Sequence, residues 1–108
     1  MEVKNIFQSQ IISSTINDEI FETILKKDNI IIERIISAGQ VTPNDSWYNQ
    51  EKCEWVILLQ GEAILEFENA EIIKMKSGNY IYIPAHIKHR VCNTSKTPHC
   101  IWLAIHFQ

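Results

Sequence analysis

Apolar and polar residues alternate along this chain over short stretches separated by turn residues. The clearest stretch runs from Glu62 to Glu68, where Ala63, Leu65 and Phe67 share one face and three glutamates lie on the other. A period of two is typical of a half-buried β-strand. Further strands are predicted at 21–25, 30–36, 54–60, 71–75, 80–83, 89–93 and 99–107. About eight to ten short strands without a confident helix predict an all-β sandwich or barrel.

The segment 17–27 fits two local structures. Capping residues at 17–18 favour a short helix, whereas the alternation of Phe21, Thr23 and Leu25 favours a strand. We favour the strand, because a turn at 27–29 leads directly into the isoleucine-rich run 30–36. The preceding N-terminal arm, 1–16, is expected to dock on a sheet or to cross to another subunit.

The run 30–36 is apolar on both faces and is interrupted only by Glu33 and Arg34. A strand with two apolar faces must be covered on both sides. Because neighbouring residues on a strand point to opposite faces, one of these two charged side chains points inward. The inward one would be a partner for an anionic or hydroxylated substrate, although exposure at a strand end is also open.

Length and composition narrow the class of protein. The chain has 108 residues, a net charge of −3 and 45% hydrophobic residues, which predicts one soluble domain spanning 1–108 and argues against a nucleic-acid surface. Its apolar runs are too short to cross a bilayer and its start lacks the core of a secretory signal, so we expect a cytoplasmic protein with no membrane partner. Three cysteines without CxxC spacing fit neither a disulfide framework nor a zinc knuckle.

Two segments carry the residues that could bind a ligand or take part in catalysis. In the segment 78–93, two histidines lie at a proline bend between two strands, and the segment 42–61 supplies a glutamate, a glutamine and aromatic residues. By parity, Glu54 shares a face with apolar neighbours, and so does His89, so both can point into one interior. A carboxylate and an imidazole buried together need each other or a cation.

The segment 78–93 resembles the second sequence motif of the cupin superfamily. The motif positions are Gly78, Pro84, His86, His89 and Asn93. His86 stands where the family usually has an inner glycine. The first cupin motif is similar only in its second half, where the spacing from Glu54 to Gly61 matches. More narrowly, the chain looks like the small single-domain cupins.

The resemblance implies a cupin-type antiparallel β-barrel, also called a double-stranded β-helix or jelly roll, with a divalent metal inside. Carried over by position, the metal ligands would fall on Tyr48, Gln50, Glu54 and His89. Only Glu54 and His89 keep the family's ligand type, because Tyr48 and Gln50 replace the paired histidines. The predicted metal site is therefore Gln50, Glu54 and His89, for zinc, nickel, iron or manganese, with weaker binding than a three-histidine site. If His86 points inward, it restores a second imidazole.

Two functions remain open at this stage. In one, the barrel holds a metal and a small-molecule ligand, and His86 or Tyr48 acts as a catalytic proton-transfer residue. In the other, the barrel is a metal-free binding or sensing module, in which His89 is hydrogen-bonded to Glu54. His106 is expected to be structural.

The face of strand 54–60 opposite Glu54 carries an apolar row formed by Trp55, Ile57 and Leu59. Such an exposed row usually marks an interface. We therefore expect a homodimer that packs these outer faces together.

Overall fold

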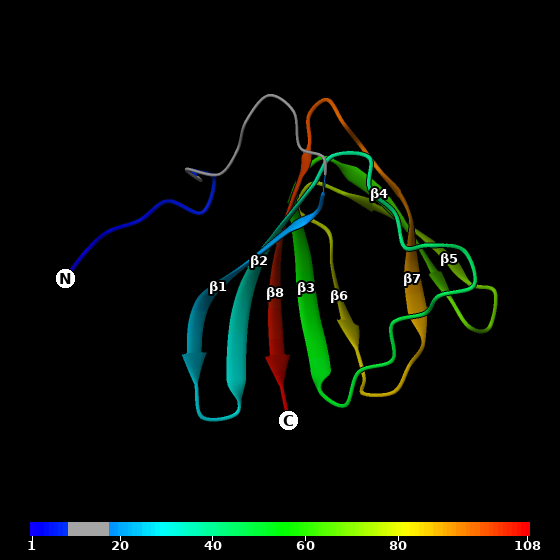
Figure 1. The fold of residues 1–108 in the computed structure, drawn as a ribbon, viewed down its shortest axis with the longest axis horizontal. Coiled ribbons are helices and arrows are strands. Elements are labelled where there is room, and N and C mark those ends of the chain that lie inside the picture. Colours follow the sequence, from blue (N-terminus) through cyan, green and yellow to red (C-terminus); the bar gives the residue numbers. More distant parts are fainter. Residues whose placement is uncertain (9–17) are drawn as a thin grey trace.

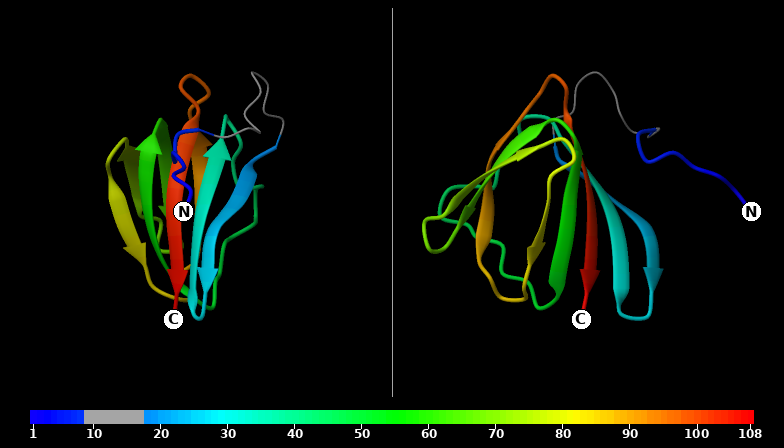
Figure 2. Two further views of the ribbon diagram at one scale, coloured as in Figure 1. Left: turned by 90° about the vertical axis from the view of Figure 1, so that its left-hand side faces the viewer. Right: turned by 180° about the vertical axis from the view of Figure 1, so that it is seen from behind.

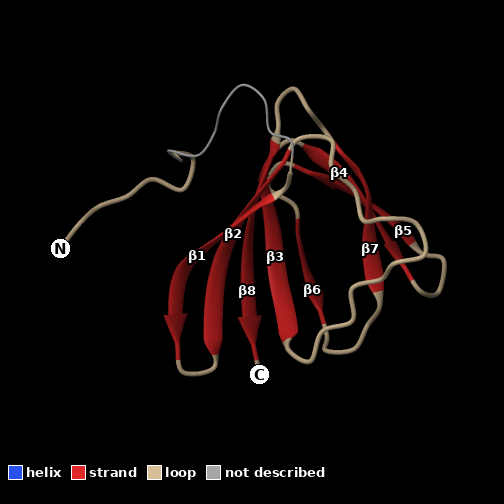
Figure 3. Cartoon of the chain, in the orientation of Figure 1, coloured by secondary structure: helices blue, strands red, loops and turns tan. Residues whose placement is uncertain are grey.

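Eight antiparallel strands in two sheets form the structure, a computed structural model that describes residues 1–8 and 18–108 (Figure 1). The strands are β1 (Ile20–Lys27), β2 (Ile30–Ser37), β3 (Cys53–Gln60), β4 (Glu62–Phe67), β5 (Ile72–Lys76), β6 (Tyr80–Ile83), β7 (His89–Thr94) and β8 (Cys100–Phe107). One sheet has the order β1-β2-β8-β3-β6 and the other β5-β4-β7. The described residues contain no helix (Figure 3), and so none that could span a membrane.

The chain passes from the larger sheet to the smaller one at Gly61, between β3 and β4 (Figure 2). Gly61 has a φ of +96°, in the left-handed region that favours glycine. A Cβ at this position would lie 2.8 Å from Sγ of Cys100. Both the backbone conformation and the close approach of β8 therefore require glycine at this motif position.

The core fills the space between the two sheets. β3 and β8 contribute Val56, Leu58 and Trp102, and β4 contributes Leu65 and Phe67, all of them buried. The inward residues of β3 and β4 alternate along each strand as the sequence predicted. The predicted all-β cupin-type fold is confirmed, and the segment 20–27 is a strand, as favoured above.

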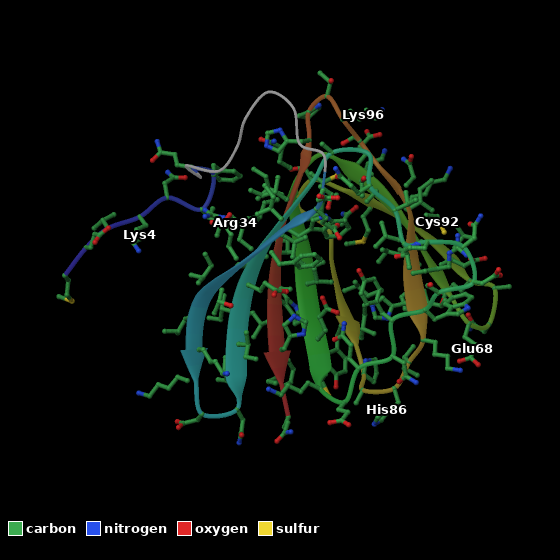
Figure 4. All side chains as sticks on the ribbon, viewed as in Figure 1. Lys4, Arg34, Glu68, His86, Cys92 and Lys96 are labelled. Atoms are coloured by element: carbon green, nitrogen blue, oxygen red, sulfur yellow. The ribbon has the colours of Figure 1, made fainter. Side chains whose placement is uncertain are left out.

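Glu33 and Arg34 point to opposite faces of β2, and the inward one is Glu33. Arg34, which Figure 4 labels, lies on the outer face. Its Nη2 atom donates to Glu22 Oε2 at 2.9 Å. Its Nη1 atom donates to the carbonyl oxygens of Ile6 and Gln8, at 3.1 and 2.9 Å. Arg34 thus fastens the N-terminal arm to the sheet. Ile11 and Ile12 of the predicted arm lie outside the described residues.

Candidate functional site

A cavity of about 90 Å³ lies between the two sheets. Its apolar wall comes from core residues of both sheets, such as Val56, Leu65 and Trp102. The polar groups that line it are Glu19, Glu33, Tyr48, Gln50, Glu54, His89 and His106. A mainly apolar cavity with a few convergent polar groups is the usual form of a small-molecule site.

His89 is the first residue of β7 and is only 6% exposed. Its Nδ1 atom lies 3.1 Å from the carbonyl oxygen of Ile87. Because a carbonyl can only accept, this contact places the proton of the neutral ring on Nδ1 and leaves a lone pair on Nε2. Nε2 lies 3.8 Å from Oε1 of Glu54, which is beyond hydrogen-bond distance.

Glu54 lies on the inner face of β3 and is also 6% exposed. Burial raises the pKa of its carboxyl group, and the nearby imidazoles of His106 and His89 act in the opposite direction. A hydrogen bond with the Gln50 side chain also favours the charged form. The sequence prediction that Glu54, Gln50 and His89 come together is therefore matched by their positions in this cavity.

Tyr48 and Gln50 reach the site because the loop before β3 pairs with the start of β7. The backbone N–H of Tyr48 donates to the carbonyl of His89 at 2.8 Å, and that of His89 donates back at 3.1 Å. The Tyr48 ring stacks on the His89 ring with centroids 5.5 Å apart. Burial raises the pKa of the Tyr48 phenol, so it keeps its proton near neutral pH. Tyr48 is a hydrogen-bond donor here and a poor metal ligand.

His86 does not line the cavity, so it does not supply the second imidazole that an inward orientation would have given. It is exposed on the loop between β6 and β7 (Figure 4). Its Nδ1 atom lies 3.2 Å from Oδ1 of Asn49, and its backbone N–H donates to the carbonyl of Gln50 at 2.8 Å. Its φ is +64°, in the left-handed region. This conformation explains why a glycine is usual at the position.

The sequence analysis expected His106 to be structural and left the orientation of Glu33 open, and the structure places both in the cavity wall. Nε2 of His106 lies 3.4 Å from Oε1 of Glu33. His106 is the register partner of Glu54 across the β3–β8 ladder. The hydrogen bond with Glu33 raises the pKa of the His106 imidazole. The signal was present in the sequence, because His106 has the same parity on its strand as Trp102 and Ala104, which are buried inside.

The polar groups fit a divalent metal in part. Within the described ranges 1–8 and 18–108, no group of three or more His, Cys, Asp or Glu side chains could hold a metal ion. Glu54 and His89 offer one oxygen and one nitrogen, and Gln50 can add an amide oxygen. A hydrogen bond from Nδ1 to a carbonyl is the arrangement that orients a histidine ligand. This donor set fits a weakly held ion whose coordination is completed by water or a ligand.

Comparison with known proteins identifies the family. The family model described as "Cupin domain" matches residues 33–106, so the chain belongs to the cupin family. No curated protein matches the sequence. The chain is 35% identical to a candidate mannose-6-phosphate isomerase from Ralstonia eutropha JMP134, with a TM-score of 0.92, covering 100% of this chain and 99% of that one.

Two more distant structures show the same fold. A cupin superfamily protein from Desulfitobacterium hafniense DCB-2 is 19% identical with a TM-score of 0.75, covering 99% of this chain and 98% of that one. A cupin with a double-stranded β-helix fold from Methanocaldococcus jannaschii is 17% identical with a TM-score of 0.71, covering 99% and 93%. The fold is therefore that of the cupin barrel.

Proposed function

We propose that the barrel interior binds a small polar molecule together with a divalent metal ion held by Glu54, His89 and Gln50. The orientation of His89 carries this proposal. Its Nδ1 atom is held by Ile87 and its Nε2 lone pair faces the Glu54 carboxylate at 3.8 Å. Two hydrogen-bond acceptors that face each other in a buried site are unfavourable unless a proton or a cation lies between them. A metal, when bound, would polarise an oxygen atom of the ligand.

The other residues have roles that follow from their own chemistry. The phenol of Tyr48, which keeps its proton, would donate a hydrogen bond to the ligand. The Glu54 carboxyl, with its raised pKa, is suited to exchange a proton with the ligand. The likeness to the Ralstonia protein supports an enzyme that acts on a hydroxylated, sugar-like compound. We leave phosphate out of the proposed ligand, because neither lysine nor arginine is among the described cavity-lining residues.

The second candidate is a metal-free binding or sensing module. It is favoured by one observation, namely that burial raises the pKa of Glu54. A protonated carboxyl needs no cation to remain buried beside an imidazole.

Binding of Mn²⁺ followed by NMR separates the two candidates. A paramagnetic ion broadens the amide signals of nearby residues, so the proposal predicts selective broadening at Gln50, Glu54 and His89. The variant His89→Ala should lose that pattern. If broadening is absent, or is equally strong in the variant, the metal-dependent function is excluded and the metal-free module remains.

We also propose that the protein is a homodimer. One row of register partners crosses the outer face of the larger sheet and is apolar throughout: Leu25, Ile32, Ile105, Trp55 and Tyr82. Leu25 and Tyr82 at its ends are each 51% exposed. An exposed apolar face of this extent is unusual on a monomer. Because the face is self-complementary in chemistry, a second copy of the chain is the partner we propose.

A further inference from the structure

The inner face of the larger sheet carries a second carboxylate–imidazole pair beside Glu54. Glu33 on β2 and His106 on β8 are 3.4 Å apart, and His106 is opposite Glu54 on β3. Glu54 in turn faces His89 on β7. Acids and imidazoles thus alternate across β2, β8 and β3 of the larger sheet, and His89 faces them from β7 of the smaller sheet.

The sign of the charge on this wall is set by the carboxylates. Glu19, Glu33 and Glu54 all line the cavity, and no lysine or arginine does so among the described residues. The one arginine of the same strand, Arg34, points to the outer face and is engaged there with Glu22. An anion that enters the cavity would meet three carboxylates in a partly desolvated space, where the imidazole of His106 is already engaged by Glu33.

This wall is more than a cluster of acids, because it belongs to a cavity that imidazoles, a phenol and an amide also line. His89 is 94% buried, and its Nε2 atom, which carries the lone pair, lies 3.8 Å from Oε1 of Glu54, beyond hydrogen-bond distance. That lone pair can accept a hydrogen bond from a ligand, as the carboxylate of Glu33 can. The groups presented to a ligand are thus mainly acceptors, and they match a molecule that supplies donors.

We propose that the cavity selects a small cationic or uncharged molecule rich in hydrogen-bond donors and rejects anions. This inference rests on the proposed small-molecule function. Glu33 is the residue we assign to this selection, because it lines the cavity and is not one of the proposed metal ligands. The cavity volume of about 90 Å³ holds roughly six to nine water-sized groups, so a small ligand fits inside it and a larger hydroxylated one would extend from its open side. An amino alcohol or a short polyol has the required size and donors.

Three two-carbon probes that differ in charge test the selection: ethanolamine, ethylene glycol and glycolate. Binding is read from the indole N–H signal of Trp102, the one tryptophan that lines the cavity. The variants Trp47→Phe and Trp55→Phe identify that signal by elimination. The full-length chain is titrated at pH 8 as purified and after EDTA treatment, so that glycolate cannot bind through a metal ion in the second sample.

We expect ethanolamine to move the Trp102 signal at concentrations at least tenfold lower than glycolate, with ethylene glycol between them. The variant Glu33→Gln should weaken ethanolamine binding about tenfold and bring glycolate close to it. The matched variant Glu68→Gln, which removes the same charge from an exposed turn, should behave as the wild type.

Each of the remaining outcomes contradicts one specific claim. If glycolate binds the EDTA-treated protein as well as ethanolamine does, or if Glu33→Gln leaves the order unchanged, the selection is wrong while the cavity remains a binding site. If none of the three probes moves the Trp102 signal at 100-millimolar concentrations (on the order of the weakest specific binding), the small-molecule function itself is overturned.

Discussion

Glu54 and His106 lie opposite each other in the β3–β8 ladder, and both side chains point into the cavity. Burial raises the pKa of Glu54, so the folded protein holds this proton more tightly than the unfolded chain does. The wild type must then lose stability as the pH rises from the ordinary pKa of a glutamate through the raised value.

The variant Glu54→Gln removes this titration. We expect it to be more stable than the wild type above that pH window and to show a flatter pH dependence across it. Urea unfolding between pH 4.5 and 8 in the presence of EDTA measures both effects. A variant that is less stable than the wild type at pH 8 would show that the charged carboxylate is stabilised in the folded state.

Variants of His86 test whether this position matters for its backbone conformation or for the chemistry of its side chain. Because its φ of +64° suits glycine, the variant His86→Gly should match the wild type in stability or exceed it by up to about 1 kcal/mol. Since the side chain is outside the cavity, ligand and metal binding should not change. Thermal unfolding and the probe titrations check the two statements.

The variant His86→Ala is the control, since alanine removes the imidazole but keeps the strained conformation. If both variants lose ligand binding, His86 has the catalytic or binding role that the sequence alone allowed. If binding is unchanged in both variants and only the glycine variant is more stable than the wild type, backbone geometry explains the preference for glycine at this position.

The dimer proposal is tested by a charge in the apolar outer face. Ile57 lies on that face, and Ile57→Glu would place a carboxylate in the interface, which a closely packed apolar contact does not tolerate. We expect the variant to sediment as a monomer at micromolar concentration while the wild type is a dimer.

Ile72→Glu is the matched control for this experiment. Ile72 is 53% exposed on β5, in the smaller sheet, and lies outside the proposed interface. The control should remain a dimer. A wild type that is monomeric in analytical ultracentrifugation would end the proposal.

The fold could be predicted from the sequence because its signals are local. The alternation at Ala63, Leu65 and Phe67 fixes which face of β4 is buried, and the same parity places Glu54 inside. Gly61 was recognisable from its spacing to Glu54. Its physical reason, the close approach of Cys100, depends on a contact between distant parts of the chain.

The site could be predicted only in part. The pairing of Glu54 with His89 follows from parity and motif, but the place of His106 depends on the register between β3 and β8, which the sequence does not encode locally. The orientation of His86 likewise depends on a left-handed backbone at one residue. The sequence alone therefore did not predict the register between strands that are distant in the chain, or the backbone conformation of a single residue.

The most direct test of the proposed function is the metal content of the tag-free protein. Wild type, His89→Ala and the control His99→Ala are dialysed to equilibrium against buffer that contains manganese, iron, nickel or zinc, and the metal bound in excess of the buffer is measured by elemental analysis. His99 is not a cavity-lining residue. We predict one equivalent of one of these metals in the wild type and in His99→Ala, and a loss of at least tenfold in His89→Ala. No metal in any sample, or equal metal in all three, would contradict the assignment of Glu54 and His89 as the metal-holding pair.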